Sequence, residues 1–290
     1  MEELNKLKSI DLASCDDEEI VELFDIIEAK CDELSNKDLK DFFYILVEIL
    51  SKRRGIAGKR AYEILSSLYP RMKEDIVSLL WSDVPYIRNS ALSIIAYHRD
   101  RDVVLGLLKD KDKDIRKFGL DIAFEMGDAE ILEKGFDDDD PNVVVSAAEY
   151  LARLGYEGAL DKIVNKLLSI PSENLYELLF IFESLIRLAY PSTPELIEKK
   201  FHDLSDPIIK DVYVRACGVS NNKKYINYLL SVLDDESVRK NALDSIFSII
   251  RNVHISDQEK ENIKKEIESR FTKMSPDELE IAGKIIQTIY

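Results

Sequence analysis

The sequence predicts an all-α protein built as an array of repeated helix pairs, and three observations support this. Apolar residues recur at spacings of three and four, as in Leu160, Ile163, Val164, Leu167 and Leu168, which is the periodicity of an amphipathic helix. No segment alternates with the period of two that a half-buried strand needs. The chain also aligns on itself with an offset of 28 residues, which indicates a repeat architecture.

The repeat is clearest between residues 85 and 168. Residues 85–88 (PYIR) align with 113–116 (KDIR) and 141–144 (PNVV), and a small residue follows three positions after each: Ala91, Gly119 and Ala147. Residues 234–242 (DDESVRKNA) restore the same acidic, Val-Arg and small-residue order near the end of the chain. The period is looser between these two regions, but the pattern persists.

Each repeat is predicted to hold two helices joined by a short turn. Gly127 and Gly155 can supply the left-handed residue that ends a first helix, and Asp128 can cap the following second helix. The helix pairs are expected at residues 17–53, 56–80, 85–109, 113–136, 141–169, 172–202, 206–233 and 236–273, with a last helix at 276–290. Prolines 85, 141, 171, 194, 207 and 276 stand where helices would begin, because the first turn does not use the N–H that proline lacks.

The motif Asp-x-x-Val-Arg-x-x-Ala, followed by Leu-Gly and an Asp-led second helix, resembles HEAT repeats, in particular the short repeats named after phycobilisome lyases. The match is strong over residues 83–168 and 234–250, moderate over 172–233 and weak before residue 55. The resemblance implies one right-handed α-α superhelix over residues 1–290, with first helices on its convex face and second helices lining its concave face. Residues 1–55 and 274–290 would be capping helices, and residues 56–273 the repeats.

Charge and cysteine usage exclude several classes of protein. The chain has 40 basic and 56 acidic residues, a net charge of −16, which opposes attraction to nucleic acids and anionic membranes. Its three cysteines form no CxxC pair, as expected of a protein in a reducing cytoplasm. No signal peptide and no segment able to insert into a membrane is expected. The near absence of glutamine is typical of a thermophile or of an AT-rich genome.

The acidic run GFDDDDPNVV, residues 135–144, lacks the glycine and glutamate that a calcium loop of the EF-hand kind requires. Similar acidic residues precede other predicted helices, so we interpret them as helix caps at the junctions between repeats. The residues assigned to this role are Asp110, Asp140 and Asp234. Arg88, Arg116 and Arg239 share one repeat position, and the resemblance implies that each pairs with an aspartate of the adjoining repeat.

No catalytic, cofactor-binding or metal-binding residue is predicted. His98, His202 and His254 are isolated, and the chain contains no HExxH, P-loop or GxSxG motif. The His-Glu pairs of deoxyhypusine hydroxylase, an iron enzyme of HEAT repeats, are also missing.

The favoured function is therefore a non-catalytic cytoplasmic scaffold that binds a protein or peptide, with basic character, along the concave face. The expected contact residues lie on second helices: Glu130, Glu133, Lys134, Lys162, Asn165, Lys166, Lys224, Asn227 and Tyr228. One alternative is an enzyme subunit of the lyase type that acts on a chromophore or a modified protein. A HEAT-like DNA glycosylase is a further alternative, but basic residues do not cluster, and Trp81 is expected in the core or between repeats.

Overall fold

The computed structural model describes residues 2–11 and 14–289, and its described residues form helices joined by turns, with no strand among them. The chain groups into two compact units, Met1–Ile131 (unit 1) and Leu132–Tyr290 (unit 2), which we describe separately. Unit 1 contains α1 Glu2–Ser9, α2 Asp17–Ala29, α3 Asn36–Lys52, α4 Ile56–Ser67, α5 Tyr69–Ser78, α6 Pro85–Tyr97, α7 Arg101–Leu107 and α8 Lys113–Met126. The unit boundary falls within α9, Ala129–Glu133.

Unit 2 continues the same alternation of helices. It contains α10 Pro141–Arg153, α11 Leu160–Ser169, α12 Leu175–Arg187, α13 Thr193–Lys200, α14 Pro207–Val219, α15 Ile226–Ser231, α16 Arg239–Asn252, α17 Asp257–Glu268 and α18 Pro276–Ile289. Short 3-10 turns flank several helices at Cys31–Glu33, Leu79–Trp81, Lys134–Asp137, Glu157–Ala159, Lys223–Tyr225 and Phe271–Lys273. None of the described helices is long and apolar enough to cross a membrane.

These helices confirm the all-α fold of helix pairs. Each of the eight expected pairs is present, from α2–α3 to α16–α17, and α18 follows as a single helix. Pro85, Pro141, Pro207 and Pro276 each begin a helix. Pro171 is the exception, because it opens a turn in which its carbonyl accepts from Asn174 N–H, and α12 begins only at Leu175. Residue 290 of the last expected helix lies outside the described residues.

The turn between the two helices of a pair has the same backbone geometry in several repeats. Gly127 and Gly155 have φ angles of 67° and 65°, as predicted, and the non-glycine residues Arg99, Ala189 and Asn221 adopt the same left-handed region. At Gly127 the N–H donates to the Phe124 carbonyl, which is part of a Schellman motif. Asp128 then accepts from Ile131 N–H at 3.2 Å, which confirms its predicted capping role.

Aspartates at the repeat junctions bond to backbone N–H groups. Asp138 accepts from Asp140 N–H at 2.8 Å, and Asp140 in turn accepts from Asn142 N–H at 2.9 Å at the start of α10. Asp110 and Asp112 repeat this arrangement before α8. The acidic run therefore ends one repeat and caps the next, because its carboxylates accept from N–H groups that a helix N-terminus leaves without partners.

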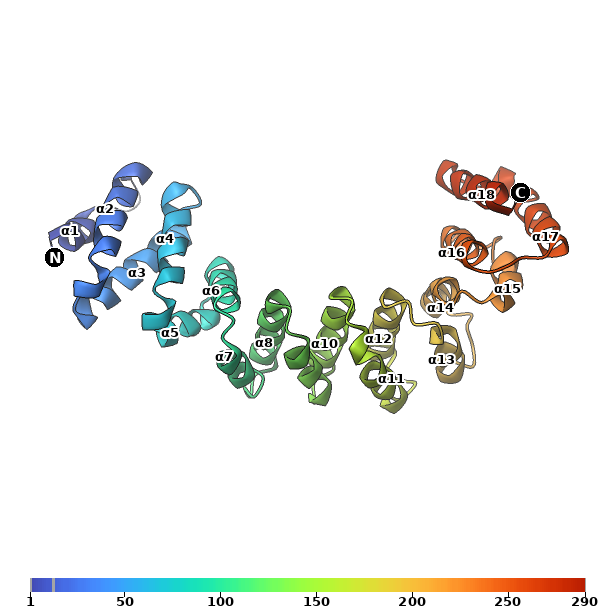
Figure 1. Cartoon of the computed structure of the whole chain (residues 1–290), viewed down its shortest axis with the longest axis horizontal. Coiled ribbons are helices and arrows are strands. Elements are labelled where there is room, and N and C mark those ends of the chain that lie inside the picture. The colour runs from blue at the N-terminus through green and yellow to red at the C-terminus, as the bar shows by residue number, and fades with distance from the viewer. Residues whose placement is uncertain (1, 12–13, 290) are drawn as a thin grey trace. The chain divides into compact units, whose positions relative to one another are not determined.

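In unit 2 the first helices of successive pairs form the tighter row. α10 packs on α12, α14 on α16, and α16 on α18, whereas the second helices contact one another much less. Figure 1 shows α12, α14, α16 and α18 along the inner side of the bend of unit 2 and α13, α15 and α17 along its outer side. The implied arrangement, with second helices on the concave face, is therefore wrong for this unit.

Small side chains explain the close approach of α14 and α16. A Cβ at Gly218 of α14 would lie 2.6 Å from Ser245 Oγ and 2.9 Å from Ser245 Cα of α16. Ser245 Oγ also donates to the Val214 carbonyl at 2.9 Å, so it bridges the same two helices. Small side chains therefore allow α14 and α16 to pack closely, and a stack of helix pairs bends toward its more closely packed row.

Candidate functional site

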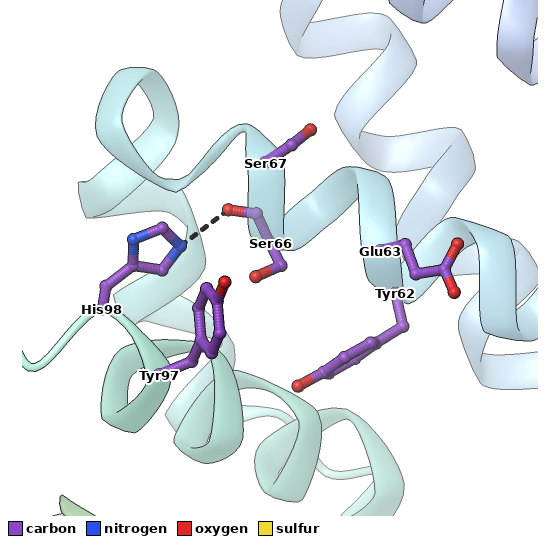
Figure 2. A pocket seen from close by; sticks show the side chains of 6 residues that line it. All are labelled: Tyr62, Glu63, Ser66, Ser67, Tyr97 and His98. Atoms are coloured by element: carbon purple, nitrogen blue, oxygen red, sulfur yellow. Dashed lines mark hydrogen bonds between the residues drawn. The ribbon is translucent and has the colours of Figure 1, made fainter.

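A pocket of about 480 Å³ lies at the C-terminal ends of α4 and α6 in unit 1. The side chains that line it are Tyr62, Glu63, Ser66, Ser67, Tyr97 and His98. Figure 2 shows the first four coming from α4, and Tyr97 and His98 from the end of the neighbouring helix. The pocket is therefore formed by two repeats, since α4 and α6 are first helices of adjacent pairs.

His98 is fixed at the C-terminal cap of α6 by its neighbours. Its Nε2 lies 2.8 Å from the Ser66 carbonyl oxygen (Figure 2), so Nε2 carries the hydrogen and donates to this oxygen. The imidazole stacks on the Tyr69 ring, with centroids 4.6 Å apart and planes 18° apart. Tyr69 itself donates to Asp100 at 3.0 Å, and both burial and this carboxylate raise the pKa of its phenol. The ring of His98 thus forms a rigid wall of the pocket.

Tyr97 presents its ring to solvent at the rim. It is 76% exposed, the largest exposed fraction among the large apolar and aromatic side chains of the described residues. Its ring meets His98 edge-on at a centroid distance of 5.2 Å. Tyr62, on the other side, is half-buried, and burial raises the pKa of its phenol. Tyr62 therefore stays neutral and keeps its electron-rich ring near neutral pH.

The electrostatics of this pocket favour a cation. The C-terminal ends of α4 and α6 both meet here, and the negative ends of helix dipoles attract positive charge. Glu63 adds a carboxylate whose ion pairs are long, 3.4 Å to Arg60 and 3.9 Å to Lys59. Arg60 is held more closely by Asp25 and Glu28. The Glu63 carboxylate can therefore form an ion pair with a cation of a ligand.

The geometry of the pocket does not assemble a nucleophile and a base. His98 Nε2 donates to the backbone carbonyl of Ser66, and Ser67 Oγ lies 2.9 Å from the Ile64 carbonyl oxygen and 3.1 Å from Glu28 Oε1, which compete for its one hydrogen. A serine nucleophile needs its own oxygen within hydrogen-bond reach of the imidazole. No group of three or more His, Cys, Asp or Glu side chains suited to a metal occurs within residues 2–11 and 14–289.

The residues expected to bind a partner lie on or beside second helices, as predicted, but in unit 2 these helices do not form the expected concave face. In unit 2 they lie on the outer row, where Glu133, Lys162, Asn165 and Lys166 line a separate hollow of about 370 Å³. Lys162 pairs with Glu133 across adjacent repeats. Exposed Glu130 pairs with Arg101 at 2.9 Å in unit 1. Partner binding through these residues, including the exposed Lys134, stays a prediction.

Tyr228 differs from the exposed anchor that the sequence predicts. It is half-buried, its ring packs edge-on against Tyr213 at 5.0 Å, and burial raises the pKa of its phenol to about 12. Its neighbour Asn227 is exposed, and Lys224 pairs with Glu195 at 2.8 Å. Helical spacing placed Tyr228 opposite the apolar stripe of its own helix, but Tyr213 of α14 covers it from the neighbouring helix.

The equivalent arginines share one backbone contact, and their implied pairing with an aspartate of the adjoining repeat stays a prediction. Arg88, Arg116 and Arg239 each donate to the carbonyl six residues earlier, of Ser82, Asp110 and Leu233 respectively. Each guanidinium therefore ties the start of a first helix to the turn before it. Arg239 also reaches the next repeat, where it donates to the Lys273 carbonyl at 2.8 Å. Asp234 does link repeats, through Arg270 at 3.0 Å and Lys273 at 2.8 Å.

An inter-repeat network that the sequence did not reveal crosses the first-helix row of unit 2. Arg215 of α14 donates to both carboxylate oxygens of Glu183 of α12 through Nη1 and Nη2, and it pairs with Asp211 of its own helix at 2.9 Å. Asp211 also accepts from Asn241 Nδ2 of α16 at 2.6 Å. The two carboxylates raise the pKa of Arg215, and the network connects three successive repeats. The positions of charged residues along one helix do not indicate which neighbouring helix they face, so this network could not be predicted from the sequence.

The repeat alignment did contain a signal for the exposed aromatics. Tyr97 aligns, at the offset of 28 residues, with the exposed Glu125 and Arg153. Trp81 aligns with the exposed Lys109 and Asp137, and it is itself 51% exposed. The expectation that Trp81 lies in the core or between repeats is therefore wrong. An aromatic side chain at a repeat position otherwise taken by charged residues faces solvent.

Comparisons with known proteins provide little further evidence. No protein-family model matches the chain, and no curated protein matches it. Among solved structures, the chain is similar to one titled "The structure of the complex of CpcE and CpcF of phycocyanin lyase from Nostoc sp. PCC7120", with 16% identity and a TM-score of 0.42. The match covers 75% of this chain and 94% of that one. At this similarity the match gives no information about activity.

Proposed function

We propose that the chain is a non-catalytic cytoplasmic scaffold that binds a protein partner, and that the pocket at Tyr97 takes a lysine or arginine side chain of that partner. The observation that carries this proposal is the 76% exposed ring of Tyr97 beside Glu63 and the C-terminal ends of two helices. Membership of the HEAT family, with one superhelical domain capped at residues 1–55 and 274–290, belongs to the same proposal.

The proposed contact uses three attractive terms. A cation over the face of a tyrosine gains about 0.5–1 kcal/mol at an exposed site. The carboxylate of Glu63 and the two helix ends add electrostatic attraction. The net charge of −16 favours encounter with a basic partner over the whole surface. Arg54 already stacks on Tyr86 of α6 at 3.7 Å in this unit, so a tyrosine of the same helix engages a guanidinium within the chain itself.

Labelled short peptides test the proposal by fluorescence anisotropy. The peptides carry lysine, arginine, alanine or glutamate at one central position, and they are titrated into the full chain at ~150 mM salt. We expect the lysine and arginine peptides to bind more tightly than the alanine and glutamate peptides. Equal binding of all four would refute recognition of a cation.

Matched variants locate the binding site. Tyr97→Ala should weaken the binding of the basic peptides by roughly two- to fivefold, the factor that one cation–π contact supplies. Tyr44→Ala, which removes another exposed ring of unit 1, should leave binding unchanged. Glu63→Gln should weaken binding without changing the thermal midpoint. If Tyr44→Ala weakens binding as much as Tyr97→Ala, the pocket is not the site.

The lyase-type subunit remains the alternative proposal. It requires a group of this chain or of a partner subunit to act on a chromophore or a modified protein. Cys31 and Cys217 are buried, burial raises the pKa of both thiols, and Cys15 is half-buried. A chromophore that copurifies with the chain and shifts its visible absorption on binding would favour this alternative over the scaffold.

A further inference from the structure

The segment from the 3-10 turn Leu79–Trp81 to the first turn of α6 exposes several apolar side chains. Trp81 is 51% exposed, and Val84 and Tyr86 are each 39% exposed. Trp81 also lines a groove of about 630 Å³, together with Leu80, Ile115 and Phe118. The groove lies within unit 1, between this turn and the start of α8. Grouped exposed apolar side chains of this kind mark interaction sites more often than single ones do.

The polar residues of the same groove are mainly acidic. Asp83, Asp112, Asp114 and Asp121 line it, against two basic residues, Arg88 and Lys117. The Arg88 guanidinium donates to the Ser82 carbonyl, so it is less available to bind a ligand in the groove. Asp112 is occupied as the cap of α8, where it accepts from Asp114 N–H at 2.9 Å. An apolar floor bordered by carboxylates complements an apolar side chain flanked by basic residues.

We propose that this groove binds a segment of a partner protein in which one large apolar side chain is flanked by lysine or arginine. The apolar side chain packs on Trp81 and Phe118, and the flanking cations lie near Asp83 and Asp114. Tryptophan at the edge of a groove is a common anchor of protein interfaces, because its ring buries a large area at a small entropic cost. The inference does not depend on the Tyr97 pocket, whose residues are different.

Trp81 itself provides the assay, because it is the only tryptophan of the chain. The full chain is titrated with a peptide that has leucine between two lysines, and with two matched peptides. In one, glutamates replace the lysines, and in the other, serine replaces the leucine. We expect only the first peptide to shift the tryptophan emission to shorter wavelength and to protect it from acrylamide quenching. No shift with the first peptide, or an equal shift with any other, overturns the proposal.

Charge variants then test the acidic border. Asp83→Asn combined with Asp114→Asn should weaken the binding of the first peptide roughly fivefold, as expected for two exposed ion pairs. Asp102→Asn is the control, because Asp102 lies in the first helical turn of α7 as Asp114 does in α8, but outside the groove. Equal weakening by Asp102→Asn would mean that net charge alone drives binding, which overturns the site. Tyr97→Ala should leave the emission shift intact even though it weakens binding in the Tyr97 pocket.

Discussion

Replacing Gly218 with alanine tests why the first helices of unit 2 form the tighter row. The added Cβ would lie 2.6 Å from Ser245 Oγ and 2.9 Å from Ser245 Cα and Cβ. The contact to Cα belongs to the backbone of α16, so a change of side-chain rotamer cannot relieve it. The two helices would have to move apart, and the hydrogen bond from Ser245 Oγ to the Val214 carbonyl at 2.9 Å would weaken.

The expected size of the effect follows from three terms. Overpacking costs about 1–3 kcal/mol, and a weakened hydrogen bond costs up to about 1 kcal/mol. The higher helix propensity of alanine stabilises the folded chain by up to about 1 kcal/mol relative to glycine. The free energy of unfolding should therefore fall by about 1–3 kcal/mol on Gly218→Ala.

Gly283 of α18 is the matched control, because a Cβ there would meet no atom within 4 Å. Gly283→Ala should raise the free energy of unfolding by about 0.5–1 kcal/mol through helix propensity alone. Urea unfolding followed by circular dichroism gives both changes. A neutral or stabilising Gly218→Ala would refute the close approach of α14 and α16, and with it our explanation of which row lies on the inner side of the bend.

Two further predictions concern ionisable groups. Lys210 and Ser237 hold the pKa of Asp235 at about 2 in the folded chain, below its ordinary value of 3.8. The ionised carboxylate therefore stabilises the fold above pH 3.8, and this stabilisation is lost as the pH falls from 3.8 toward about 2. The thermal midpoint should therefore drop in this range, and it should drop less in Lys210→Met; an equal drop in both would contradict the assignment. Among the thiols, half-buried Cys15 should react first with a disulfide reagent, whereas buried Cys31 and Cys217 should react only on unfolding; prompt labelling of all three would contradict their burial.

The candidate site could be predicted only in part from the sequence. The alignment at 28 residues contains a signal for exposure, since Tyr97 and Trp81 replace charged residues of other repeats, but the apolar run that ends at Trp81 led to the wrong expectation of a core residue. It did not show that Tyr97 and His98 line one pocket with Tyr62 of the preceding repeat, because that arrangement depends on how α4 and α6 pack. Tyr228 illustrates the opposite case, since a spacing that predicts exposure on one helix does not include the neighbouring ring of Tyr213.

The sequence by itself determined the local structure of this protein. The sequence signals that the structure confirms all act within a few residues. They are helical periodicity, prolines at helix starts, the left-handed Gly127 and Gly155, and capping aspartates such as Asp140. The tertiary structure decided which helix row packs more closely, which charged residues pair across repeats, and where the Tyr97 pocket and the Trp81 groove form. These features depend on contacts between side chains about one repeat apart, such as Gly218 with Ser245, and short-range patterns do not encode the spacing between packed helices.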